Sequence, residues 1–207
     1  GGVPLYLSKL FQHYISLDIL QGDGNAWILD HNLFDIYKAP DTLGEIIIDS
    51  YNSLDQQRKD ILQNLSIFRE PVQVDEFLSF LGPNDNFPHA IKDLINDNIL
   101  CVDKGFLDFP NPMYRQIIIK KLSSTKRSKL NSKIADFFIQ YYPDNAIEIT
   151  HYLLEAKNIE ECMKYGIKAL SILCDKRQYH SAFELSFSLY DLARSLGSRS
   201  QQIQFVK

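Results

Sequence analysis

The sequence is poor in the residues that mark several protein classes. It has three cysteines in 207 residues and no CxxC pair, which excludes a disulfide scaffold and predicts free, buried thiols in a reducing compartment. Its 9 glycines and 8 prolines are too few for an all-β fold with many tight turns. Its apolar runs are only a few residues long, so we expect neither a membrane span nor a signal peptide, and a cytoplasmic location.

Motifs of common catalytic and metal sites are missing as well. The sequence contains no GxxxxGK[ST], HExxH or GxSxG, and so lacks the phosphate cradle, zinc helix and nucleophile elbow that these patterns build. None of its five histidines has another histidine three or four positions away, as a helical zinc site would require. We therefore expect the segment not to be an enzyme by itself and to hold no metal.

The residues that are present predict a folded, helical protein. Hydrophobic residues make up 45% of the chain and charged residues 23%, which is typical of one large globular domain or two small ones. The 13 phenylalanines and 11 tyrosines against one tryptophan predict an aromatic core. A net charge of -4 gives no electrostatic argument for general nucleic-acid binding.

Apolar spacing changes along the chain in the order expected of a winged helix. Helical spacing extends over 4–20 and then, after Pro40, over 43–54, 56–68, 75–81 and 87–98. Asp41 or Thr42, then Asp55 and Asp75, are placed to cap the second, third and fourth of these helices. Two short strands, 99–102 and 106–109, follow around a turn that ends in Gly105. We predict a winged-helix domain over 41–111.

The rest of the chain is predicted to be helical. Residues 112–142 form connecting helices, and three further helices cover 145–156, 159–174 and 179–196. The last two share one apolar template, with Gly166 and Ser186 where adjacent helices could approach closely. The first and third start about 33 residues apart, near the 34-residue tetratricopeptide (TPR) period. The predicted fold class is mainly α, a winged helix with one small β-hairpin followed by antiparallel TPR-like helices, whose array starts at 143–207 and is expected to be cut at Lys207.

A basic run stands out in the connecting helices. Seven lysines and arginines and no acidic residue occur between Met113 and Lys133. Three interpretations are open: a solvated helical face, a docking surface for an acidic partner or a nucleotide phosphate, and nucleic-acid binding. DNA recognition would use the helix at 87–98, where Asp93 and Asp97 outnumber Lys92 and would repel phosphates. A DNA-binding transcription regulator and a TPR-like interaction scaffold are therefore the alternatives that we carry.

Several segments, in order, resemble the C-terminal part of STAND-class (AAA-related) signalling ATPases. They are GGVPLYLSKL, a lone Trp, APDTLGEIIIDSYNSLDQQRKDILQNLSIF, AIKDLINDNIL, FLDFPNPMYRQIIIKKLSSTKRSKLNSKIADFF and ITHYLLEAKNIEECMKYGIKA. The resemblance covers about 1–195. It implies that 1–38 is the end of the ATPase's helical lid, that 41–111 is its winged helix, and that a TPR-like sensor begins after 142. The P-loop core would precede Gly1.

The resemblance also implies contacts with bound ADP. Gly2, Val3 and Pro4 match the lid's GxP motif, which contacts the adenine side; the alternative is a helix N-terminus with proline in its first turn. Asn111 stands where many members have a histidine that touches the β-phosphate. Arg115 follows four residues later and could pair with a phosphate or with a nearby acid. Leu130-Asn131 replaces the family's Leu-His pair, and His151 is expected to be a packed repeat residue.

The implied function is regulatory and non-catalytic. The segment would couple the nucleotide state (ADP or ATP) of its own upstream P-loop domain to the binding of a protein or small ligand at the helical repeats. From the short apolar runs and the net charge we expect no membrane and no nucleic-acid partner, and an oligomer formed on activation is left open. The two alternatives named above differ from it in requiring no nucleotide.

Overall fold

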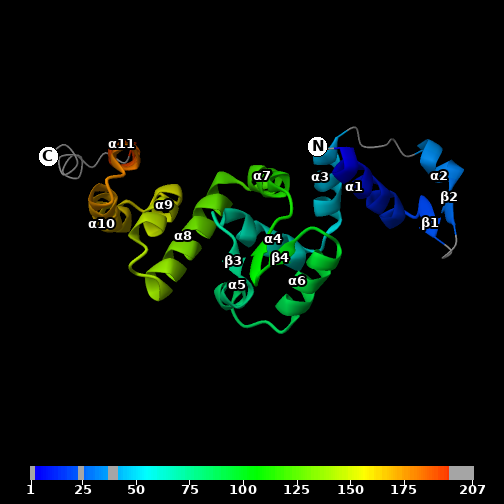
Figure 1. Ribbon diagram of the computed structural model, residues 1–207, viewed down its shortest axis with the longest axis horizontal. Helices are drawn as coiled ribbons and strands as arrows, with labels where there is room; N and C mark the ends of the chain where they lie inside the picture. Colours follow the sequence, from blue (N-terminus) through cyan, green and yellow to red (C-terminus); the bar gives the residue numbers. More distant parts are fainter. Residues whose placement is uncertain (1–2, 23–25, 37–41, 196–207) are drawn as a thin grey trace.

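The computed structural model describes residues 3–22, 26–36 and 42–195 (Figure 1). These residues are mainly α-helical, with two small antiparallel sheets. Three groups of elements follow one another along the long axis of the molecule, from α1, β1, β2 and α2 at one end to α10 and α11 at the other (Figure 1). None of the described helices combines the length and apolar character that a bilayer crossing requires.

The N-terminal group differs from the prediction. Helix α1 covers Val3–Ser16, and the chain turns at Asp18, whose φ is 57°. This turn takes the next residues out of the helix, so the predicted helix over 4–20 is too long. Instead β1 (Leu20–Gly22) pairs antiparallel with β2 (Trp27–Leu29), a hairpin that the sequence analysis missed, and α2 (His31–Ile36) follows.

Residues 43–109 form what we call the hairpin unit. Its helices are α3 (Leu43–Ser53), α4 (Gln56–Ile67), α5 (Val74–Leu81) and α6 (Asn86–Asn96). Its sheet has the order β3–β5–β4, from Val72–Gln73, Phe106–Asp108 and Cys101–Asp103, all antiparallel. Strand β3 was not predicted, because two residues carry no periodicity. The hairpin β4–β5 was predicted.

Two of the predicted helix caps are present. The Thr42 hydroxyl accepts a hydrogen bond from the Glu45 amide at 3.2 Å, and the Asp55 carboxylate accepts one from the Arg58 amide at 2.8 Å. The prediction for Asp75 is wrong, since α5 starts two residues earlier, with Gln73 at the N-cap position and Asp75 inside its first turn. Because α5 starts at Val74, it follows strand β3 with no loop between them. Asp41 lies outside the described residues.

Five more helices follow, up to the last described residue, Ser195. They are α7 (Pro112–Lys121), α8 (Ser124–Tyr141), α9 (Ala146–Ala156), α10 (Ile159–Asp175) and α11 (Tyr179–Ser195). From α8 onward each packs on the next, and Gly166 of α10 lies directly against Leu189 of α11. The predicted fold class is confirmed: the chain is mainly α, with a small hairpin followed by antiparallel TPR-like helices.

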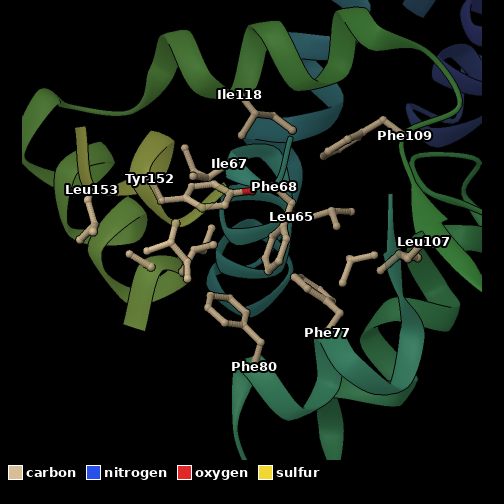
Figure 2. Close-up of a cluster of buried hydrophobic side chains, with 14 of the residues drawn as sticks. Leu65, Ile67, Phe68, Phe77, Phe80, Leu107, Phe109, Ile118, Tyr152 and Leu153 are labelled. Carbon is tan, nitrogen blue, oxygen red and sulfur yellow. The ribbon is translucent and has the colours of Figure 1, made fainter. Parts of the chain in front are cut away.

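One hydrophobic core extends from the hairpin unit into the C-terminal helices. Phe68, Phe77 and Phe80 form its aromatic centre, with Phe68 edge-on to both others at ring separations of 5.8 and 5.1 Å. In Figure 2, Tyr152 and Leu153 of α9 join this cluster from the side opposite Leu107. The two groups of helices therefore share buried surface.

The cysteines only partly meet the expectation of buried thiols. Cys162 is buried, and burial raises the pKa of its thiol to about 12. Cys101 is half-buried and Cys174 is exposed, which contradicts the prediction for these two. Cys174 lies in the last turn of α10.

Candidate functional site

Asn111 is the N-cap of α7. Its side-chain oxygen accepts a hydrogen bond from the Met113 amide at 2.9 Å, and Pro112 follows at the first helical position. Pro112 lacks an amide hydrogen, and its fixed φ suits the first turn, so the capping oxygen serves the next free donor. The residue has a structural role that the resemblance alone did not indicate.

We expect Asn111→Ala to lower the free energy of unfolding by about 1 kcal/mol, because it removes the cap. Asn111→Asp keeps an acceptor and adds a negative charge at the helix N-terminus, which should hold or raise stability. Urea unfolding followed by circular dichroism measures both. Equal losses for Ala and Asp would contradict a capping role.

Arg115 pairs with an acid from the hairpin. Its Nη2 donates to the Asp108 carboxylate at 2.5 Å, and the guanidinium lies 5.6 Å from the centre of the Phe109 ring. The sequence left a phosphate or a nearby acid open as the partner of Arg115, and the structure shows the acid, Asp108. The second guanidinium nitrogen, Nη1, is buried and has no hydrogen-bond partner among the described residues, so this arginine retains one donor.

The predicted lid motif is only partly described. Gly2 lies outside the described residues, while Val3 and Pro4 form the first turn of α1. Further along this helix, the Lys9 ammonium donates to the backbone oxygens of Asp97 and Asn98 at 3.2 and 2.9 Å. These carbonyls end α6, where the helix dipole attracts a cation.

Lys9 also lies 5.7 Å from the centre of the Tyr114 ring on α7. Burial lowers its pKa, and the charge of Asp97 opposes that shift. The same lysine therefore joins α1 to α6 and to the helix that Asn111 caps. Sequence analysis missed it, because nothing local links residues 88 positions apart.

Most of the basic run is engaged within the protein. Arg115, Lys126 and Arg127 form ion pairs with Asp108, Asp60 and Glu155, in that order. The ammonium groups of Lys121 and Lys133 lie over the rings of Tyr51 and Phe80. Lys120 and Lys129 are exposed and have no such partner within the described part of the chain. The run thus mainly fastens α7 and α8 to their neighbours.

Tyr152 links α9 to the hairpin unit. Its side chain is 2% exposed, and its hydroxyl accepts a hydrogen bond from the Arg69 amide at 3.1 Å. In Figure 2 its ring reaches from α9 toward Phe68 at the end of α4. Burial raises the pKa of Tyr152 to about 12, so the hydroxyl stays neutral and can act as this acceptor at neutral pH.

The Arg69 side chain is exposed, and its charge acts on two groups of α9, Glu148 and His151. Burial raises the pKa of Glu148, and the positive charge of Arg69 opposes this shift. Burial lowers the pKa of His151, and Arg69 lowers it further. His151 is half-buried, as expected of a packed repeat residue. The junction between the hairpin unit and α9 therefore holds both the buried tyrosine and a set of charges that influence one another.

The same junction contains an open cavity of about 270 Å³, bordered by the end of α4, α5, α8 and α9. In the described part of the chain, no group of three or more His, Cys, Asp or Glu side chains is arranged to hold a metal ion. The junction is thus a candidate for binding and for transmission of a conformational change rather than for metal chemistry.

Comparison with known proteins supports the fold. No family model matches the chain, and no curated protein matches its sequence. A crystal structure of a Signal Transduction ATPase with Numerous Domains (STAND) protein with a tetratricopeptide repeat sensor, from Pyrococcus horikoshii, is similar with a TM-score of 0.56 and 15% identity. The match covers 82% of this chain and 28% of that protein. At this identity the likeness shows the fold alone.

Proposed function

We propose that the chain is the regulatory segment of a STAND-type signalling ATPase, in which it relays the state of a helical sensor to a P-loop core supplied by an upstream domain. The likeness to a STAND protein with a TPR sensor carries this proposal. In it, residues 1–38 are the end of the lid, 41–111 a winged helix, 112–142 connecting helices, and 143–207 the start of the sensor.

The packing offers a physical path for the relay. Tyr152 fixes α9 to the hairpin unit through Arg69, and Lys9 fixes the hairpin unit to α1. A ligand that binds one arrangement of these groups better than another shifts their equilibrium by its differential affinity. The ligand at the repeats is a protein or a small molecule in this proposal, and an oligomer on activation would be one readout.

The nucleotide, ADP or ATP, is held mainly by the upstream core. Gly2, Val3 and Pro4 would border the adenine. Asn111 and Arg115 would face the phosphates. The Nη1 of Arg115 is buried and has no partner among the described residues, so a phosphate oxygen could use it as a donor only after neighbouring atoms move aside. The Asp108 carboxylate already holds the other nitrogen, so a phosphate would share this arginine with Asp108.

Dissociation of a fluorescent ADP from the full-length protein tests the nucleotide contact. Asn111→His adds a side chain that can carry positive charge toward the β-phosphate, so ADP release should slow several-fold. Asn158→His is the matched control, because Asn158 caps α10 in the same way and lies far along the chain from the motif. Equal ADP release rates for the wild type and Asn111→His would contradict a contact between Asn111 and the nucleotide.

DNA binding by the hairpin unit has less support. Helix α6, the candidate recognition helix, carries Asp93, which is paired with Arg58 at 2.5 Å, and Asp97 lies at its C-terminal end. The pair removes one arginine from the surface that would meet phosphates. Salt-dependent binding to duplex DNA by the chain would favour this alternative over the regulatory one.

A further inference from the structure

The cavity at the junction is lined mainly by aromatic rings and glutamates. We call its wall the aromatic cage, which comprises the rings of Phe68, Phe137, Phe138, Tyr142 and Tyr152 together with Glu70, Glu76 and Glu148. Phe68 and Tyr152 are buried and belong to the core, whereas Tyr142 is 42% exposed at the rim. The base of the cage is therefore fixed and its entrance is open to solvent.

The rings of the cage meet at angles. Phe138 lies 5.5 Å from Tyr152 with 36° between the ring planes, and 5.7 Å from Tyr142 with 52° between them. Phe137 lies 6.2 Å from Tyr142 at 55°. These rings line the cavity, and a ring face turned toward it presents negative π surface. Such surface attracts cations.

The glutamates add negative charge to the same space. The Glu76 carboxylate lies near the Tyr142 hydroxyl and raises the pKa of Tyr142, so Glu76 is the charge at the rim. Burial raises the pKa of Glu148, Arg69 opposes this, and the charge of Glu70 raises it further. Glu70 and Glu148 thus repel each other. Among the described residues, no lysine or arginine lines the cavity. The positive charges of Arg69 and Arg115 both act on Tyr152 at its base, so two cations stand against the three carboxylates of the wall.

We propose that the aromatic cage binds a small organic cation, an alkylammonium or quaternary ammonium ion free in solution. Aromatic faces combined with carboxylates recognise such ions, whereas an anion would be repelled and a neutral molecule would gain nothing from the charges. The cavity lies just below the usual range for drug-sized ligands, which suits a single small ion. The repulsion between Glu70 and Glu148 is relieved when a cation lies between them.

The cage also gives the ion a regulatory position. Its walls come from the hairpin unit (Phe68, Glu70, Glu76) and from α8 to α9 (Phe138, Glu148). A bound cation would contact both groups and favour the arrangement in which they are together. Naming this ion as the stimulus of the sensor rests on the function proposed above; the binding itself does not.

Isothermal titration calorimetry of the chain with choline chloride tests the proposal, with 3,3-dimethylbutan-1-ol as the neutral compound of the same shape. We expect choline to bind about tenfold more tightly than the alcohol or better. Glu76→Gln should weaken choline binding about tenfold, since the carboxamide keeps nearly the shape of the carboxylate but carries no charge. Tyr142→Leu should weaken it several-fold, and Tyr142→Phe, which keeps the ring, should not.

Glu160→Gln, on the exposed start of α10, is the charge-matched control and should bind as the wild type does. Far-ultraviolet circular dichroism of each variant confirms that it is folded. Equal affinity for choline and the alcohol, no heat with either, or full binding by both Glu76→Gln and Tyr142→Leu would overturn the proposal. Any of these results leaves the ADP release experiment unaffected, so failure of the cage and failure of the regulatory role are distinguishable.

Discussion

Tyr152→Ala is expected to lower the free energy of unfolding by about 3–5 kcal/mol, the range for removing a large buried aromatic side chain. The residue is 2% exposed, its ring lies 5.5 Å from Phe138, and Figure 2 places it against the centre of the core. Its loss opens a cavity where the hairpin unit meets α9. Urea unfolding monitored by circular dichroism gives the change in stability.

Tyr152→Phe separates packing from hydrogen bonding. The ring stays, but the Arg69 amide loses its acceptor, and we expect a smaller loss of about 1 kcal/mol. Tyr179→Ala is the matched control: this tyrosine is 64% exposed on α11, so its removal should change stability by no more than about 0.5 kcal/mol. If Tyr152→Ala cost no more than Tyr179→Ala, the hairpin unit and the C-terminal helices would not share a core.

The features that could be predicted from the sequence are local. Thr42 and Asp55 cap their helices because a side chain reaches an amide three residues ahead, and this spacing is visible in the chain. The hairpin β4–β5 was found because two short apolar strands flank a turn ending in Gly105. By contrast β3 has only two residues, too few to show a periodicity. Leu20 of β1 continues the helical spacing predicted for 4–20, and this concealed the hairpin β1–β2.

The features that could not be predicted join distant parts of the chain. Lys9 reaches the end of α6 across 88 residues, and Tyr152 reaches Arg69 across 83. No pattern in one sequence links such pairs. The basic run shows the same limit. Its charges could be counted in the sequence, but its ion-pair partners could not be predicted, because Asp60, Asp108 and Glu155 come from other elements.

The candidate site also has a part that the sequence indicated and a part that it did not. The family resemblance indicated Asn111 and Arg115, and the structure adds a cap and an ion pair to their roles without testing the contact with nucleotide. The aromatic cage had no signal in the sequence, because its rings and glutamates come from four separate elements. The abundance of Phe and Tyr predicted an aromatic core but not that some of the rings would border a cavity.

Gly166→Val is expected to destabilise the chain by about 2 kcal/mol, although replacing a glycine inside a helix ordinarily stabilises it. A Cβ at position 166 would lie 2.8 and 3.0 Å from the two methyl carbons of Leu189. Leu189 is fully buried, so its side chain has little room to move, and α11 would have to shift away from α10. Urea unfolding measures the loss.

Three further variants identify contact with Leu189 as the cause. Gly44→Ala, in α3, places its Cβ no closer than 3.6 Å to a neighbouring atom and should stabilise by about 0.5 kcal/mol through helix propensity. Leu189→Ala alone should cost about 2–5 kcal/mol, but combined with Gly166→Val it should cost less than the sum, because the new methyl groups enter the space that the leucine vacates. Additive losses would mean that the small residue at 166 is not what allows α10 and α11 to approach so closely.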